Sequence, residues 1–325
     1  MRWVALLLCM TGLHAAFGDA AYVDYELKLV FPAKLGGMDC EKVEKYNNED
    51  LGFSLFYQRG DQFDAEVSVY NLGRPSIETG HDVDGIDIVI RSVEDDYKRR
   101  EEGAAVSNVR KRGTMVVPKK GEIQFSNTVF QYLQPRGIDG RTNNVPRILS
   151  VYATAAHNHF FKIQFSFDVA GSKDARLMAD RMVQELSTTI KGGLSEEELL
   201  LAACTALIRN PADYGGRAAA QLVLAQSQTM DNLNIYPHLF AWPDGYRKPK
   251  NANLLIAAYF AGMIQVVVPQ KLEAGGECEG FIAMLSAYES LRKNDQIESI
   301  PDFDEWVKAA DKKALFQELL YAPVE

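Results

Sequence analysis

The pair Gly192-Gly193 separates two stretches of this 325-residue chain that have different hydrophobic periods. Before the pair, several segments alternate apolar and polar residues, which is the two-residue period of a β-strand. After it, apolar residues recur every three or four positions, as on one face of a helix. Two glycines interrupt either period and let the backbone bend. We therefore predict an α+β domain over residues 20–192 and a mainly α-helical domain over residues 193–325.

The first domain is predicted to contain an antiparallel sheet. Its clearest strand covers residues 159–169, where every second residue is a large hydrophobe: Phe161, Ile163, Phe165 and Phe167. This alternation is typical of a strand with one buried face. Further strands are expected over residues 51–57, 63–70, 106–117, 122–133 and 147–155. Short connections between successive strands favour antiparallel pairing, and so an α+β fold.

Two helices are expected to pack on this sheet. The first begins near Ile86, ends at Gly103 and has an apolar face formed by Ile86, Val89, Ile90, Val93 and Tyr97. The second begins at Ser172 and is expected to turn four residues inward, namely Leu177, Met178, Met182 and Leu186. Both sets recur at three- and four-residue steps, which places each on one side of a helix.

The second domain opens with a strong helix start. Ser195 can accept a hydrogen bond from a free amide of the first turn, and Glu198 occupies the capping-box position. Residues 253–267 are apolar almost all round, which predicts the central helix of the domain. Other helices are expected over residues 218–226, 281–291 and 306–320.

The element order over residues 45–190 resembles the PsbP/Mog1 fold, which often serves as an accessory or binding module. The strand ending Val69-Tyr70-Asn71-Leu72-Gly73 is similar to one in uncharacterised exported bacterial proteins. Residues 195–325 resemble a helical module of unknown function in such proteins, through the apolar run 254–262, Gly280-Phe281 and Tyr288. These resemblances imply an architecture and no reaction.

Residues 1–19 have the pattern of a signal peptide. Arg2 supplies a positive charge, residues 4–10 form a short apolar run, and small residues follow. The favoured cleavage triplet is Ala16-Phe17-Gly18, with Gly18-Asp19-Ala20 as the alternative. The run is shorter than the roughly 20 apolar residues that span a bilayer. We therefore expect an exported protein, periplasmic or secreted, with no transmembrane segment after the signal peptide is removed.

The net charge of the chain and the absence of several motifs argue against some classes of function. The formal net charge is -9, which argues against a general nucleic-acid or anionic-lipid partner, because these need a basic surface. Neither G-x-x-x-x-G-K nor G-x-G-x-x-G is present, so no phosphate-binding loop is predicted, and no cofactor is expected. G-x-S-x-G and C-x-x-C are absent too.

Two groups of residues resemble metal ligands. His157 and His159 could share a metal if they lay on one strand, but Asn158 between them favours a hairpin turn with exposed histidines. The segment His81-Asp82-Val83-Asp84-Gly85-Ile86-Asp87 lacks EF-hand spacing and favours a helix N-terminus. No metal site is predicted.

Two surfaces are candidates for binding. Residues 235–249 contain three prolines and four aromatic residues, which predicts a loop between helices. Leu239 and Trp242 are expected to cap the helical core, and Tyr246 and Arg247 are expected to lie outside. The candidate binding residues of this loop are Trp242, Tyr246 and Arg247. Arg110, Lys111 and Arg112 form a basic cluster that could contact an acidic partner or an anionic polymer of the envelope, or simply be a solvated hairpin rim.

Three cysteines follow the signal peptide: Cys40, Cys204 and Cys278. Cys204 and Cys278 fall on predicted helices of one domain and could form a disulfide. The alternative is that all are reduced, since a buried thiol packs as a small hydrophobe. An odd count in an exported protein leaves at least one cysteine without an intrachain partner.

Taken together, these patterns predict a non-enzymatic binding or accessory protein of the bacterial envelope, whose partner is a protein or a small ligand. One alternative is a hydrolase whose residues meet only in the fold, for example a histidine next to a serine or carboxylate in a pocket. Another is a structural protein that assembles through an unpaired cysteine.

Overall fold

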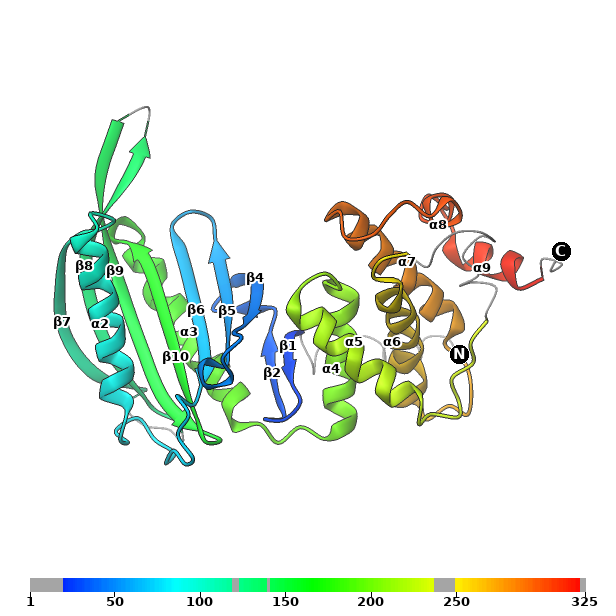
Figure 1. The fold of residues 1–325 in the computed structure, drawn as a ribbon, viewed down its shortest axis with the longest axis horizontal. Coiled ribbons are helices and arrows are strands. Elements are labelled where there is room, and N and C mark those ends of the chain that lie inside the picture. Colours follow the sequence, from blue (N-terminus) through cyan, green and yellow to red (C-terminus); the bar gives the residue numbers. More distant parts are fainter. Residues whose placement is uncertain (1–19, 119–122, 139–140, 237–248, 322–325) are drawn as a thin grey trace. The chain divides into compact units, whose positions relative to one another are not determined.

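The computed structural model of the chain describes residues 20–118, 123–138, 141–236 and 249–321. It divides into two compact units (Figure 1). The sheet unit is Ala33–Gly192, and the helical unit starts at Gly193 and also contains the N-terminal segment that ends at Pro32. The predicted fold class, an α+β sheet domain followed by a helical region, is confirmed. Residues 20–32 differ from expectation, because they pack with the helices.

The sheet unit contains an eight-stranded antiparallel sheet in the order β3-β4-β5-β6-β10-β9-β8-β7. The strands are β3 (Lys34–Leu35), β4 (Met38–Lys45), β5 (Phe53–Arg59), β6 (Phe63–Tyr70), β7 (Ser107–Val117), β8 (Phe125–Ile138), β9 (Arg141–Ala156) and β10 (His159–Asp168). Sequence patterns did not reveal β3 and β4. In β4 only Met38 and Val43 are buried, so this strand has no regular alternation to detect.

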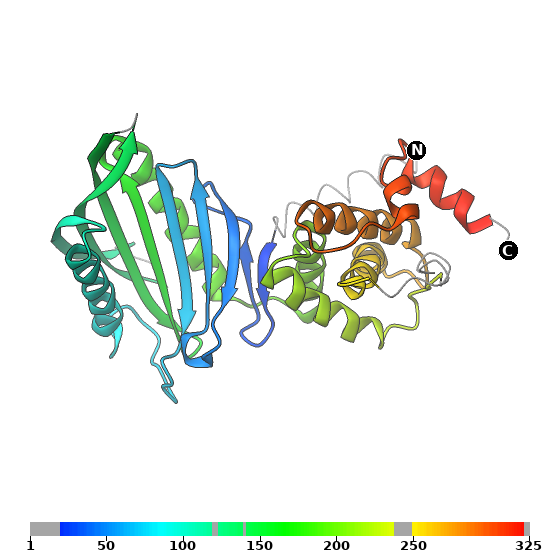
Figure 2. The same ribbon diagram turned by 45° about the horizontal axis from the view of Figure 1, so that its top comes forward.

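Two helices cover opposite faces of this sheet (Figures 1 and 2). Helix α2 (Ile86–Glu102) packs on what we call the α2 face, which carries the even-numbered residues of β10, and it buries all five predicted residues. Helix α3 (Ser172–Lys191) lies on the other face. Its Met178, Met182 and Leu186 are buried as expected.

The prediction that Leu177 points inward was wrong, because its side chain is 55% exposed. The buried stripe of α3 runs instead through Ala175, Met178, Met182, Val183, Leu186 and Ile190. Leu177 directly precedes Met178, and neighbouring positions on a helix point about 100° apart. The helix can therefore bury Met178 and leave Leu177 in solvent.

The helical unit combines a small hairpin with six helices in the described residues. These elements are β1 (Ala20–Asp24), β2 (Leu29–Pro32), α4 (Glu196–Arg209), α5 (Tyr214–Ser227), α6 (Ala252–Gln270), α7 (Glu277–Lys293), α8 (Pro301–Trp306) and α9 (Lys312–Tyr321). The predicted capping box of Ser195 and Glu198 is confirmed. The continuous helix predicted over residues 306–320 was wrong. Asp311 accepts hydrogen bonds from the amides of Lys313 and Ala314, which starts α9 as a separate helix.

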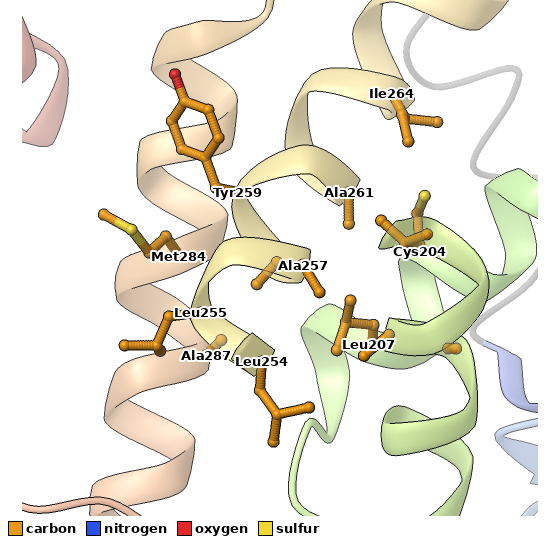
Figure 3. Packing of buried hydrophobic residues seen from close by; sticks show 14 of the residues in the cluster. Cys204, Leu207, Leu254, Leu255, Ala257, Tyr259, Ala261, Ile264, Met284 and Ala287 are labelled. Atoms are coloured by element: carbon orange, nitrogen blue, oxygen red, sulfur yellow. The ribbon is translucent and has the colours of Figure 1, made fainter. Parts of the chain in front are cut away.

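Helix α6 is the centre of the helical unit, as its all-round apolar composition predicts. Figure 3 shows side chains of α6 between α4, which supplies Cys204 and Leu207, and α7, which supplies Met284 and Ala287. In the described residues, α6 is the one helix long and apolar enough to cross a membrane. That is weak support for insertion, because most of its apolar window is buried inside the unit, as in any core helix.

Two glycines let α6 and α7 approach closely. A Cβ atom on Gly262 of α6 would overlap the carbonyl oxygen of Glu279 and lie 2.8 Å from the Ala283 Cβ. A Cβ on Gly280 of α7 would lie 2.7 Å from the carbonyl oxygen of Tyr259. The nearest atom in each case is a backbone carbonyl oxygen, which cannot move aside without shifting a helix. The distance between the two helices therefore depends on both glycines.

We expect Gly262→Ala to destabilise the helical unit by about 1–3 kcal/mol, because the added methyl group is overpacked. Helix propensity alone predicts the opposite sign, since Ala is favoured over Gly by about 1 kcal/mol inside a helix. Chemical denaturation followed by circular dichroism measures the difference. Gly113→Ala is the control, because no atom lies within 4 Å of a Cβ there. An unchanged or higher stability of Gly262→Ala would contradict the close contact.

Candidate functional site

Helix α2 leaves part of its face of the sheet uncovered. Its buried side chains cluster with residues of β8 and β9 and with Phe160, at the start of β10. Beyond that point, towards β4, the same face becomes polar. The residues that follow on β10, β6 and β5 are Lys162, Gln164, Ser166, Ser68, Glu66 and Ser54. A run of polar side chains on central strands calls for hydrogen-bond partners.

A hydrogen-bonded cluster satisfies most of these groups and is centred on the Glu66 carboxylate. Ser54 Oγ and Ser68 Oγ donate to Glu66 Oε1 over 2.9 and 2.8 Å. Gln164 Nε2 donates to Glu66 Oε2 over 3.2 Å, and Tyr46 donates to Ser54 Oγ over 3.0 Å. Three strands thus hold one carboxylate in a fixed orientation, and charge-assisted bonds of this kind are comparatively strong.

Glu66 and Gln164 line a recess of about 320 Å³ on the α2 face. The strands supply polar groups from Glu41, Gln58, Asp64 and Ser166, and apolar surface from Phe56 and Leu149. The last turns of α2 supply Tyr97 and Arg100. The recess therefore combines an apolar floor with several polar groups, which is the usual composition of a small-molecule site.

Tyr97 and Arg100 form the α2 side of this recess. The Arg100 guanidinium lies over the Tyr97 ring, 4.7 Å from its centroid, in cation–π geometry. Burial raises the pKa of Tyr97, so its hydroxyl stays protonated. In the part of the chain that the structure describes, no carboxylate lies within 4.0 Å of the Arg100 guanidinium. Below Tyr97, the hydroxyls of Tyr132 and Ser166 are hydrogen-bonded over 2.8 Å.

Carboxylates outnumber cations around the recess. Glu41, Asp64 and Glu66 face a single lining cation, Arg100. Asp64 Oδ2 accepts a hydrogen bond from Arg147 over 2.7 Å, which neutralises one of these charges. The remaining excess among the lining residues is negative. The rings of Phe56 and Tyr97 already have cations over them, since Lys42 Nζ lies 5.7 Å from the Phe56 centroid and Arg100 lies over Tyr97; Lys42 is also paired with Glu44. The carboxylates are therefore what favours a positively charged guest.

Lys162 of β10 is an amine next to this cluster. It pairs across the ladder with Ser68, and its Nζ lies 5.7 Å from the centroid of the Tyr70 ring. Burial lowers the pKa of Lys162, and the nearby carboxylates of Glu66 and Asp96 offset part of that effect. Lys162 does not line the recess. Its charge therefore affects the recess only through space and not by direct contact with a guest.

A second polar cluster, at the end of β10, is structural. Arg136 donates to Asp168 Oδ2 over 2.9 Å, and Arg147 bonds to Asp64 and to Gln134 Oε1. Arg147 Nε also lies 3.2 Å from Asp168 Oδ1, without a hydrogen-bonding angle. These pairs tie β6, β8, β9 and β10 together at one edge of the recess.

The two histidines considered as metal ligands, His157 and His159, lie at the hairpin turn that Asn158 between them favours. His157 and Asn158 both have positive φ and form the turn between β9 and β10. His157 Nε2 contacts the Ile190 carbonyl oxygen, and His159 Nδ1 contacts that of His157. Residues 81–87 lead into the N-terminus of α2 as predicted, with Gly85 as the N-cap and Asp87 in the first turn, but no aspartate side chain caps the helix. Asp84 instead pairs with Arg74 over 3.1 Å.

None of the residues predicted for binding lines the recess in the part of the chain that the structure describes. Trp242, Tyr246 and Arg247 fall outside the described residues. Arg110, Lys111 and Arg112 are exposed on β7, which is not one of the strands lining the recess. Arg112 Nε donates to Gln131 Oε1 over 2.9 Å. The recess was missed because its residues come from five strands and a helix.

The candidate disulfide between Cys204 and Cys278 is not formed in the structure. Cys204 is fully enclosed by apolar side chains of the helical unit, and Figure 3 shows it beside Ala261 and Ile264. Burial raises the pKa of its thiol, which disfavours the reactive thiolate. Cys278 is half-buried in the first turn of α7.

Comparison with known proteins places this chain in no family. No protein-family model matches the sequence, and no curated protein matches it. The function therefore has to be argued from the residues of the recess and from the physical chemistry of their arrangement.

We expect Lys162→Met to raise the melting temperature at pH 7. The folded state binds the Lys162 proton more weakly than the unfolded chain, whose ordinary lysine pKa is 10.5. The charged amine therefore destabilises the fold at neutral pH, and this penalty fades as the pH rises towards 10.5. The gain from the methionine should shrink over the same range.

Scanning calorimetry at pH 7 and pH 10 measures this effect. The matched control is Lys173→Met on α3, where the lysine is exposed and no stabilisation is expected. A lower melting temperature for Lys162→Met at pH 7 would mean that the amine makes a net favourable contact.

Proposed function

We propose that this chain is an exported binding protein that holds a small, hydroxyl-bearing organic cation in the recess beside α2. The observation that carries this proposal is the Glu66 carboxylate, held by Ser54, Ser68 and Gln164 at a recess with a negative charge excess. An ammonium group would pair with the carboxylates. The side-chain amides of Gln58 and Gln164 would bond to hydroxyl groups of the same guest.

Preorganisation supports this assignment. A carboxylate that already accepts three hydrogen bonds does not need to reorient when a cation arrives, so binding loses less entropy. The recess volume of about 320 Å³ is at the small end of ligand pockets. That size favours a monosaccharide-sized guest. The resemblance to PsbP/Mog1 proteins stays part of the proposal, and it too favours a binding role.

A hydrolase is the weaker alternative. Ser54 and Ser68 contact a carboxylate that could act as a base, but their side chains are 0% and 3% exposed. A nucleophilic oxygen has to reach the substrate, and these two are enclosed by their neighbours. Assembly through a cysteine would have to use Cys40 or Cys278, because Cys204 is fully buried.

Titration calorimetry with glucosamine as the probe tests the binding proposal. Glucosamine has an ammonium group and several hydroxyls, N-acetylglucosamine keeps the hydroxyls without the charge, and glucuronate reverses the charge. We expect saturable binding of glucosamine, at least about tenfold weaker binding of N-acetylglucosamine, and none of glucuronate. Ethanolamine and spermidine extend the test to other cations.

Glu66→Gln should reduce the affinity for glucosamine by about tenfold or more, since it removes the central charge and keeps a similar shape. Glu102→Gln is the matched control, because Glu102 is exposed at the end of α2 and does not line the recess. Equal binding by Glu66→Gln, tighter binding of glucuronate, or no binding of any cation in the panel would refute the proposal.

Export makes a separate prediction about the first residue of the mature chain. Ala20 opens β1, pairs with Pro32 and is fully buried in the helical unit. Cleavage after Ala20 would remove it, whereas cleavage after Gly18 keeps the hairpin complete. We therefore expect chain expressed in a bacterial host with a secretion pathway to begin at Asp19.

Intact-mass measurement of the exported chain identifies this terminus. Ala16→Lys should block cleavage, because signal peptidase needs a small residue there. A mature chain that begins at Ala21, or an uncleaved chain in the cytoplasm, would contradict the prediction.

A further inference from the structure

Strand β7 has one edge without a neighbouring strand in the described part of the sheet. It is the last strand in the sheet order and pairs with β8 alone. In an antiparallel pair, alternate residues of an edge strand direct their N–H and C=O groups outward, where they can bond to another strand. The Val109 amide is already used, since it donates to Glu101 Oε1 over 3.3 Å. Residues 110–116 are exposed.

The edge has two parts with different chemistry. The pairing with β8 is irregular between Ser107 and Arg110 and between Lys111 and Gly113, and it is regular over residues 113–117. The irregular part carries the basic cluster Arg110, Lys111 and Arg112. The regular part carries two exposed hydrophobes, Met115 at 57% and Val116 at 38% exposure. A β-ladder can extend along the regular part, while the basic part adds charge.

A recess next to the edge could receive side chains of a bound strand. It has a volume of about 610 Å³ and lies between α2 and the β7–β8 pair. Lys111, Thr114 and Val116 of β7 line one side, and Ile90, Asp87 and Glu94 of α2 line the other. Asp82 and Asp84 line it too, so the recess suits the uncharged side chains of a bound strand and not its acidic ones. Peptide-binding edges commonly combine main-chain hydrogen bonds with a pocket for alternate side chains of the peptide.

We propose that the β7 edge binds an extended, acidic segment of a partner protein by antiparallel strand addition. Apolar or β-branched residues of that segment pair with residues 113–117, and the acidic residues that follow them contact Arg110, Lys111 and Arg112. The antiparallel direction puts the apolar half first in the partner segment, because β7 itself runs from its basic part to its apolar part.

Charge decides between an acidic partner and a second copy of this chain. In the described residues, no carboxylate lies within 4.0 Å of Arg110, Lys111 or Arg112. Lys111 nevertheless faces Glu94 in the same recess. The pKa of that carboxyl group is lowered by Lys98 and, to a smaller extent, by Lys111, so Arg110 and Arg112 carry the charges most available to a ligand. Two β7 edges paired antiparallel over residues 113–117 would leave their basic clusters at opposite ends of the ladder, each without a counter-charge. An acidic strand supplies that counter-charge and gains association rate and specificity from it.

This proposal does not depend on the recess that holds Glu66. The two surfaces share no lining residue, and they lie on different sides of α2. Loss of one activity should leave the other unchanged, so the two proposals can fail separately.

Fluorescence anisotropy with a labelled peptide tests the edge. The probe is Thr-Val-Thr-Val-Thr-Glu-Asp-Glu, capped at both ends and titrated with the full chain. Two comparison peptides complete the design: one carries N-methyl groups at alternate backbone nitrogens on the pairing edge, and one has lysines in place of the acids. We expect saturable binding of the probe and at least about tenfold weaker binding of both comparison peptides.

The double variant Arg110→Glu/Arg112→Glu should weaken probe binding by about tenfold or more and restore binding of the lysine peptide. Both side chains are exposed, so the fold is expected to persist, and circular dichroism checks this. Lys173→Glu/Arg176→Glu on α3 has the same net charge change and should bind like the unmodified chain. The proposal is overturned if the N-methylated peptide binds equally well, if both double variants lose affinity alike, or if the probe does not saturate.

Discussion

The two-residue pleat of strand β10 is the constraint on which the sheet unit depends. Its odd-numbered residues Phe161, Ile163, Phe165 and Phe167 are buried on the α3 face, so the even-numbered residues must lie on the other. A shift of register by one residue would put Lys162 and Gln164 into the apolar core. The cost of burying those groups fixes the register of β6 and β9 against β10, and this in turn places the polar residues on the α2 face.

The polar residues line a recess because α2 is too narrow to cover the whole α2 face of the sheet. The helix closes over β8 and β9, where the sheet is apolar, and the uncovered strands satisfy their polar groups among themselves. The result is a carboxylate, Glu66, supported by two buried hydroxyls and an amide. In the helical unit the corresponding constraint is the contact at Gly262 and Gly280, which lets α7 lie directly against the central helix α6.

Sequence patterns predicted the elements with strong periodicity. The alternation in β10, the stripe of α2, the all-round apolar α6 and the capping box at Ser195 each have a local physical cause. Predictions failed where neighbours decide the outcome. Strand β4 buries only two residues, so it shows no regular alternation. On α3, Met178 is buried and the neighbouring Leu177 is exposed. Asp311 starts a new helix within a stretch whose amphipathic pattern predicts a continuous one. The β1–β2 hairpin belongs to the helical unit because its apolar side chains pack against those of the helices.

The sequence by itself determined the fold class, the two periods on either side of Gly192-Gly193, and the basic cluster at Arg110, Lys111 and Arg112. These follow from local order along the chain, because period and charge are properties of neighbouring residues. The tertiary structure alone decided that Glu66 meets Ser54, Ser68 and Gln164, and that β7 is an edge strand. Both depend on strand order, which brings together residues 98 positions apart, as for Glu66 and Gln164. No local pattern in the sequence encodes that order.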